Sequence, residues 1–334
     1  MIHIGQVLAV NDSSQVSAAR RTATQCAEAL GLNANAVGMA ALVATELATN
    51  ILKHGDGGSM LFGSVLNGRK SLVLVACDRG PGIANIARAM EDGYSTAGSP
   101  GTGLGAIARN ATSLDVYSQA GKGTVVLCRV EDGLAPLKFV PDAFAMAGIC
   151  IAKTGEEHSG DAWVGVQSRD FATIAIADGL GHGVFAATAS SAAVRVIAEK
   201  AESPIEHIFQ DAHGALRATR GAAIGIARIS RGQNRVDFAG VGNIAGTIAL
   251  HETSRRTVSL GGIVGHEMRR VQTFSYPWES EAVLILASDG ISTSWNASQY
   301  PGLLQRDPAL IASVLFRDHC RGNDDATVVV VKAA

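Results

Sequence analysis

Asp78-Arg79-Gly80-Pro81-Gly82-Ile83 and Asp178-Gly179-Leu180-Gly181-His182-Gly183 each place an aspartate at the start of a glycine-rich turn. An apolar segment of strand-like composition precedes each aspartate, so both carboxylates are expected at strand ends. Because the motifs around them differ, the two turns predict two different sites in two parts of the chain.

The length and composition are those of a globular, turn-rich protein. The chain has 334 residues, close to two domains on a rough prior of about 150 residues each. The formal net charge is −2 and neither half is basic, so no nucleic-acid partner is expected. Five scattered cysteines without a C-x-x-C pair indicate a reducing compartment. No signal-peptide pattern and no charge-free apolar run of about 18 residues is found, so we predict a cytoplasmic protein without a membrane partner.

Hydrophobic periodicity predicts an α/β chain built in two parts. In the first part, helices are expected over residues 14–30 and 35–54, and strands over 60–66, 71–76 and 124–130. In the second part, strands are expected over 162–167, 171–177, 222–229, 235–239, 244–251, 282–287 and 326–332, and helices over 185–201, 205–219 and 308–318. Turn-forming residues at 131–136 separate the parts and predict domains 1–135 and 142–334.

Glu46 and Asn50 lie four residues apart in a predicted helix, so their side chains share one face about 6 Å apart along the axis. A carboxylate there can take a proton, and an amide oxygen can ligate Mg²⁺. Alone, this pair also fits an ordinary solvated helix face. Three further motifs favour a nucleotide pocket: Asp78-x-Gly80-x-Gly82, Gly101-Thr102-Gly103-Leu104-Gly105 opening a helical run, and Gly121-Lys122-Gly123-Thr124 leading into a strand.

The order of these motifs resembles the GHKL (histidine-kinase-like) ATPase family, and within it the serine kinases of anti-sigma and stressosome switches. The chain has no G-x-x-x-x-G-K-[ST] loop, which excludes a Walker-type ATPase. The resemblance implies a two-layer α+β sandwich that binds ATP and Mg²⁺. It implies that Asp78 accepts from the adenine amine, Asn50 holds Mg²⁺ and Glu46 is the base on a substrate hydroxyl. The same family pattern makes Gly80, Gly82, Thr124 and residues 101–105 nucleotide-binding positions, and it makes residues 101–105 with the stretch before them the ATP lid.

Four aspartates of the second part fall at predicted strand ends: Asp161, Asp178, Asp289 and Asp324. A single aspartate at such a place is usually a turn residue. As a set they offer hard oxygen ligands without cysteine or clustered histidine, which favours Mg²⁺ or Mn²⁺ over zinc. Two such ions about 3.5–4 Å apart can activate a water toward a phosphoryl group. His182 fits either an orienting role at such a site or a structural hydrogen bond.

The order and flanking residues of these aspartates resemble the metal-dependent PPM phosphatases, in their SpoIIE-like branch. This resemblance implies an αββα sandwich in which Asp178 bridges two Mn²⁺ or Mg²⁺ ions and the carbonyl of Gly179 is a further ligand. It implies that Asp161 completes the coordination of one ion, and that Asp289 and Asp324 hold the other ion. Asp325 lies beside this set and is not counted among the ligands.

Together the two resemblances predict a bifunctional regulator, an ATP-dependent protein serine kinase fused to a phosphoserine phosphatase. Its expected partners are small STAS-domain switch proteins (anti-sigma-antagonist or stressosome proteins), with a sigma factor or a downstream regulator as further candidates. In one alternative, the first domain binds ATP only to shape a surface that sequesters a partner, and the phosphatase is the sole enzyme. In another, the phosphatase domain is a metal-free relic.

Overall fold

The computed structural model describes residues 1–65, 70–90, 103–133, 143–168, 170–251 and 253–334. The chain divides into two compact units. The first is Met1–Phe139 with Gln305–Arg317, and the second is Val140–Leu304 with Asp318–Ala334. The division into functional domains 1–135 and 142–334 stays a prediction, and residues 134–142 lie outside the described residues.

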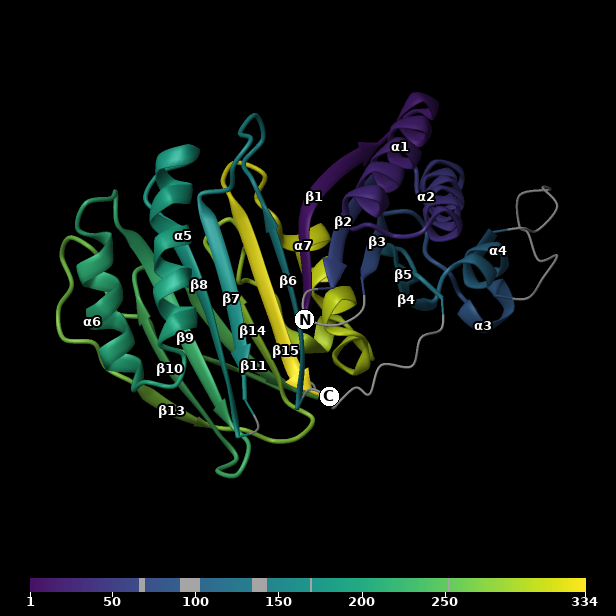
Figure 1. The fold of residues 1–334 in the computed structure, drawn as a ribbon. Coiled ribbons are helices and arrows are strands. Elements are labelled where there is room, and N and C mark those ends of the chain that lie inside the picture. The colour runs from purple at the N-terminus through teal and green to yellow at the C-terminus, as the bar shows by residue number, and fades with distance from the viewer. Residues whose placement is uncertain (66–69, 91–102, 134–142, 169, 252) are drawn as a thin grey trace. The chain divides into compact units, whose positions relative to one another are not determined.

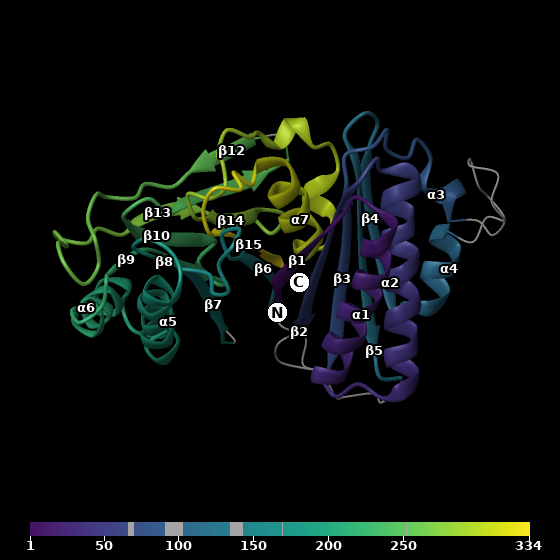
Figure 2. The same cartoon turned by 90° about the horizontal axis from the view of Figure 1, so that it is seen from above.

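The first unit is a helical layer on one antiparallel sheet. The sheet has the strand order β1-β2-β3-β5-β4, and α1 and α2 lie on one face of it (Figure 2). The strands are β1 (Ile2–Val10), β2 (Gly58–Val65), β3 (Ser71–Asp78), β4 (Ser113–Gln119) and β5 (Gly123–Glu131). The helices are α1 (Ser13–Ala29), α2 (Ala34–His54), α3 (Ile86–Ala89) and α4 (Gly103–Asn110), and the unit also takes in most of α7 (Pro308–His319).

Helix α2 is the core helix of this unit. Asn33 caps its first turn by accepting a hydrogen bond from the Ala36 amide, and its buried side chains recur at helical spacing from Ala36 to Ile51. By length and composition α2 could also cross a membrane, with a mean hydropathy of 1.3 in its most apolar window. Its apolar face packs with side chains of the sheet in one hydrophobic cluster.

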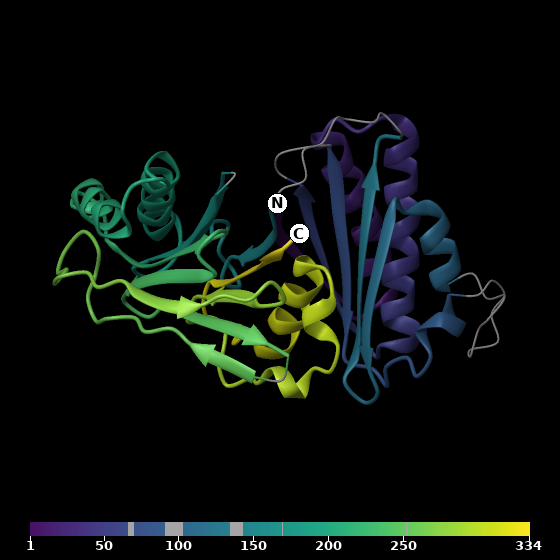
Figure 3. The same ribbon diagram turned by 90° about the horizontal axis from the view of Figure 1, so that it is seen from below.

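The second unit contains two antiparallel sheets that pack on one another, with α5 and α6 on the outer face of one of them (Figures 1 and 3). That sheet has the order β13-β10-β9-β8-β7, and the other has the order β12-β11-β14-β15-β6. The strands are β6 (Phe144–Ile151), β7 (Asp161–Gln167), β8 (Phe171–Gly179), β9 (Ala222–Ser230), β10 (Arg235–Val241), β11 (Ala245–Leu250), β12 (Thr253–Arg256), β13 (Phe274–Pro277), β14 (Val283–Ala287) and β15 (Ala326–Ala333). The helices are α5 (Val184–Glu199) and α6 (Ile205–Leu216), with short 3-10 turns at Ala297–Gln299 and Leu303–Gln305. The predicted α/β class, with a two-sheet second part, is confirmed.

Gly148 of β6 packs tightly against Trp163 of β7, where the two sheets meet. A Cβ atom at Gly148 would lie 2.2 Å from the indole ring, closer than any real contact. We expect Gly148→Ala to lower the free energy of unfolding of the second unit by about 1–3 kcal/mol, because an overpacked core has to shift its strands or its indole. Urea denaturation followed by Trp fluorescence measures this. Gly232→Ala is the matched control, because a Cβ atom there meets no atom within 4 Å, and an equal loss in both variants would contradict the packing argument.

Candidate active sites

Asp78 ends β3 and is held by backbone amides on both sides. Its Oδ1 accepts hydrogen bonds from the amides of Gly80 at 2.9 Å and Thr124 at 3.1 Å. Among the described residues, no donor reaches Oδ2, so this oxygen is available to accept from a ligand. The structure therefore brings together three of the residues that the sequence predicts for nucleotide binding.

The backbone segments around Asp78 approach one another so closely that position 123 has room only for glycine. Gly123 has φ +86°, and a Cβ atom there would lie 2.1 Å from the Asp78 carbonyl oxygen. That carbonyl accepts a hydrogen bond from Nη1 of Arg317, at 3.0 Å, and Arg79 donates in turn to the Arg317 carbonyl. Burial raises the pKa of the Asp78 carboxyl, and the two amide hydrogen bonds and the charge of Arg317 oppose that rise. Arg317 lies far away in sequence and was not predicted.

Helix α2 runs away from Asp78 and carries Asn50 and Glu46 at increasing distance. Gly55, its C-cap, packs against the Asp78 side chain, since a Cβ atom there would lie 2.4 Å from the Asp78 Cβ. At a rise of 1.5 Å per residue, Asn50 follows about 7.5 Å along the axis and Glu46 about 13.5 Å. Both side chains are half-buried. This order suits a nucleotide with its base at Asp78 and its phosphates beside the helix.

The remaining predicted nucleotide positions are only partly described. Gly82 has φ +76° in the turn after Asp78, and Gly103, Leu104 and Gly105 begin α4. Gly101 and Thr102 lie outside the described residues. The residues of α4 that can be placed include Leu104 and Ile107, which are buried in the same core cluster as α2. The start of α4 is thereby fixed beside the helix that carries Asn50.

In the second unit, the predicted metal-binding aspartates lie at or next to the ends of strands from both sheets. Asp161 begins β7, and it pairs directly with Asp178 of β8 in the antiparallel register, which places both side chains on one face. Asp289 follows β14 in the other sheet, and Asp324 precedes β15, the neighbour of β14. Gly179 is buried, and its amide donates to the Gly160 carbonyl at 3.0 Å.

The buried carboxylates of this group raise one another's pKa values. Asp161 is 4% exposed; its Oδ2 accepts from the Ser288 hydroxyl at 2.7 Å, whereas its buried Oδ1 has no hydrogen-bond partner. Burial raises the pKa of Asp161 to about 7, with contributions from Asp325 and Asp289. Burial raises the pKa of Asp178 to about 8, with the nearby aspartates adding to the rise.

Three residues of this site were missed or discounted by sequence reasoning. Asp325 is 3% exposed; its Oδ1 accepts from the Lys153 amide at 2.9 Å, and its buried Oδ2 has no hydrogen-bond partner. The Ser288 hydroxyl ties Asp161 to the opposite sheet, and Asn243 donates from Nδ2 to Asp289 at 2.7 Å. Ser288 and Asn243 thus orient two of the predicted ligands, as residues around metal sites do.

The residues present fit hard divalent cations. Unpartnered buried oxygens on Asp161 and Asp325, together with the carboxylates of Asp178, Asp289 and Asp324, are the ligand type that Mg²⁺ and Mn²⁺ prefer. In the part of the chain that the structure describes, no three His, Cys, Asp or Glu side chains converge closely enough to form a ready metal-binding group. The side chains would therefore have to move closer together around an ion. The positive charge of the ion would offset the repulsion between the carboxylates.

This repulsion gives a prediction for Asp325→Asn. The variant keeps the oxygen that accepts from Lys153 and removes one negative charge. We expect the metal-free variant to unfold about 2–4 °C above the metal-free wild type, which corresponds to about 1 kcal/mol, and to lose most of the stabilisation by Mn²⁺. Thermal unfolding with chelator and with Mn²⁺ measures both. Asp211→Asn, on an exposed part of α6, should change neither value, and a Mn²⁺ response of wild-type size in Asp325→Asn would contradict the placement.

His182 of the Asp178 turn has a partner of its own. Nδ1 of His182 pairs with Oε1 of Glu156 at 2.6 Å, which gives this histidine a structural partner.

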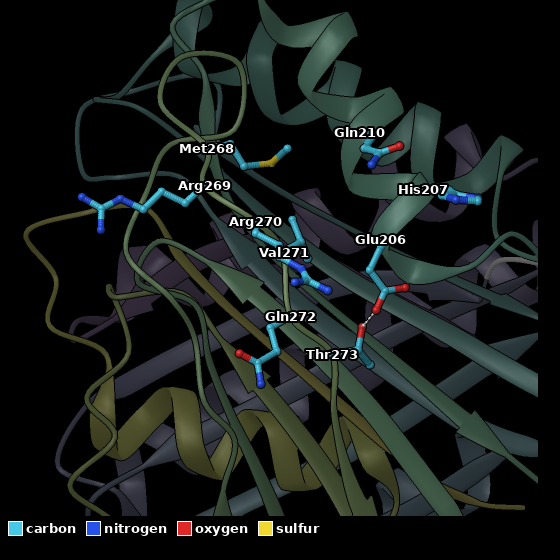
Figure 4. A pocket seen from close by; sticks show the side chains of 9 residues that line it. All are labelled: Glu206, His207, Gln210, Met268, Arg269, Arg270, Val271, Gln272 and Thr273. Carbon is cyan, nitrogen blue, oxygen red and sulfur yellow. Dashed lines mark hydrogen bonds between the residues drawn. The ribbon is translucent and has the colours of Figure 1, made fainter.

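A pocket of about 780 Å³ lies between α6 and residues 268–273, and no predicted site residue lines it. Figure 4 shows Glu206 and Thr273 turned toward one another across this pocket, and Thr273 donates to the Glu206 carboxylate. The pocket is therefore separate from the predicted metal site.

Comparison with known families assigns both parts of the chain. The histidine kinase-like ATPase domain family matches residues 9–130, and the stage II sporulation protein E (SpoIIE) family matches residues 169–334. Glu46, Asn50 and Asp78 fall within the first match. Asp178, Asp289 and Asp324 fall within the second, whereas Asp161 lies before it.

Two curated proteins of Bacillus subtilis (strain 168) are similar to this chain. One is the serine/threonine-protein kinase RsbT, which is 35% identical over 112 residues, or 33% of this chain and 84% of that protein. The other is the phosphoserine phosphatase RsbX, which is 25% identical over 143 residues, or 42% of this chain and 71% of that protein.

Two solved structures share the fold over 57% of this chain. One, described as the bacterial stressosome, a modular system adapted to control secondary messenger signaling, is 26% identical with a TM-score of 0.53 and is covered to 99%. RsbX in complex with magnesium is 21% identical with a TM-score of 0.52 and is covered to 96%, a likeness that shows the fold alone. The chain therefore belongs to the histidine kinase-like ATPase family through an N-terminal domain of the RsbT serine/threonine kinase type, and it carries a C-terminal phosphatase domain of the SpoIIE type.

Proposed function

We propose that this chain phosphorylates and dephosphorylates serine residues of STAS-domain switch proteins in a partner-switching pathway of the cytoplasm. The observation that carries the proposal is that one chain holds both the amide-held Asp78 and the paired carboxylates of Asp161 and Asp178. The similarity to RsbT and to a stressosome structure supports the choice of substrate class. The sites have opposite chemistry, so the chain can set and remove the same kind of mark.

In the kinase reaction, the proposed roles follow the order of residues along α2. Asp78 accepts from the adenine amine through the oxygen that the protein leaves without a donor. The Asn50 amide oxygen would bind Mg²⁺, and Glu46 would take the proton of the attacking serine hydroxyl. Phosphoryl transfer depends on positioning and charge neutralisation, which is why the rigid turn at Asp78 and the fixed start of α4 contribute to the rate.

In the phosphatase reaction, Asp161, Asp178, Asp289 and Asp324 would hold two Mn²⁺ or Mg²⁺ ions with the Gly179 carbonyl, and Asp325 would add to this set. When bound, the ions supply a water of lowered pKa and neutralise the charge of the phosphoryl group. Ser288 holds Asp161 in place and Asn243 holds Asp289, so the carboxylates remain oriented despite their repulsion.

One experiment tests both activities. The purified chain is incubated with ATP, Mg²⁺ and STAS-domain proteins encoded beside it, then with Mn²⁺ after ATP removal, and phosphoserine is followed by mass spectrometry. The proposal expects phosphoserine on one STAS protein in the first step and its loss in the second. A STAS panel that never gains phosphoserine, with ATP bound, would instead favour the sequestration alternative for the first domain.

A further inference from the structure

Arg220 is fixed in place beside the turn that carries Asp178. It lies between α6 and β9, and the next residue, Gly221, accepts a hydrogen bond from the Leu180 amide at 3.0 Å. The Gly221 amide also donates to Oγ1 of Thr219, at 3.0 Å. The backbone on either side of Arg220 is therefore tied down, and one tie leads directly to the metal-site turn.

The Arg220 side chain lies along this turn and carries an uncompensated charge. A Cβ atom at Gly181 would be 2.9 Å from its Nη1, and its guanidinium carbon lies 5.1 Å from the centre of the Phe185 ring. Such stacking holds a guanidinium while leaving its N–H groups free to donate. Among the described residues, no carboxylate pairs with Arg220, and the nearby Glu156 is paired with His182. The turn thus has one exposed cation available for an anion.

Exposed apolar side chains gather on the same turn and on the first turn of α5. Leu180 is 37% exposed, Val184 57% and Phe185 63%, and these are three of six exposed large hydrophobic residues found in the described chain. Because exposing such side chains together is unfavourable, a cluster of this kind marks a surface that contacts a partner. Its place is set by the metal-site turn, which points to the substrate of that site as the partner.

We propose that Arg220 binds the phosphate of a phosphoserine substrate, and that Leu180, Val184 and Phe185 receive apolar side chains next to that serine. Arginine suits this task because its planar N–H groups can donate two parallel hydrogen bonds to phosphate oxygens. The positive charge also offsets the repulsion between the phosphate and the aspartates of the site. This inference rests on the phosphatase half of the proposed function and names the chemistry of its substrate.

Binding without turnover is the first test, in the full chain carrying Asp178→Asn and in the presence of Mn²⁺. The probes are a fluorescent peptide with leucines around a phosphoserine and its unphosphorylated twin. In this background, we expect Arg220→Ala to weaken the phosphopeptide about tenfold and to leave the twin unchanged, with partial recovery in Arg220→Lys. Val184→Ser, which leaves the Phe185 ring under Arg220 in place, should weaken both peptides about fivefold. Arg217→Ala, an exposed arginine three positions away, is the matched control for charge and should change neither.

Turnover in the chain with Asp178 intact is the second test. Arg220→Ala should raise KM for both para-nitrophenyl phosphate and the phosphopeptide, whereas Val184→Ser should raise KM for the phosphopeptide alone. If the wild type hydrolyses both substrates and Arg220→Ala behaves like Arg217→Ala, the inference fails while the phosphatase function stands. If the wild type hydrolyses neither but binds the phosphopeptide through Arg220, the function fails and the phosphate site stands. Absence of both hydrolysis and binding overturns both.

Discussion

Asp178→Asn is expected to reduce metal-dependent hydrolysis of phosphoserine substrates about a thousandfold or more. Asp178 faces Asp161 across the β7–β8 pair, and burial, together with the charges of the nearby aspartates, raises its pKa. In the proposed phosphatase site it is the carboxylate shared between two cations. Asparagine keeps its size but removes the charge and one strong oxygen ligand. Initial rates with a phosphoserine peptide at saturating Mn²⁺ measure the loss.

The control for this prediction is Asp211→Asn, an exposed aspartate of α6 that should keep the wild-type rate. Phosphorylation by the first domain should also be unchanged in Asp178→Asn, since its residues belong to the other unit. Full hydrolysis by the variant would remove Asp178 from the metal site. A wild type without any metal-dependent hydrolysis would instead favour the relic alternative for the second domain.

Glu46→Gln is expected to reduce phosphoryl transfer to a partner serine by about 10²–10⁴-fold, the usual contribution of a general base. ATP binding should remain within about twofold of the wild type. Glu46 lies about 13.5 Å along α2 from the C-cap Gly55, which packs against Asp78. Radiolabel transfer to the substrate measures the first quantity and calorimetric titration of ATP the second. Loss of transfer with retained binding separates catalysis from nucleotide recognition.

The two readings of the first domain differ most clearly in this variant. A module that uses ATP only to shape a partner surface should not respond to Glu46→Gln, and its partner affinity should equal that of the wild type. Glu28→Gln, on an exposed position of α1, is the matched control and should preserve transfer. Equal transfer rates in the Glu46 and Glu28 variants would contradict the role given to Glu46.

Local patterns were enough to predict most elements. The strands β1, β4, β6, β12 and β13 were not predicted, and two of these omissions have local causes. The long helix α2 and the strands β3 and β5 follow from periodicity, because packing on one face repeats their apolar residues. Strand β1 was not predicted; Gly5 and Gln6 interrupt its apolar pattern, and its register with β2 is irregular between Ile4 and Gln6. Strand β4 was also missed, because it is an edge strand with only two buried side chains.

For the sites, the sequence by itself determined the chemistry of the two turns, because an aspartate among glycines sets which groups a backbone can offer. Only the tertiary structure decided which atoms remain available. Asp324 and Asp325 are neighbours in the loop before β15, and the packing of that loop decides that Asp325 is buried while Asp324 is half-buried. The contacts of Ser288 with Asp161 and of Arg317 with Asp78 join residues more than one hundred positions apart. No local pattern encodes such pairs, because they arise when distant strands and helices pack.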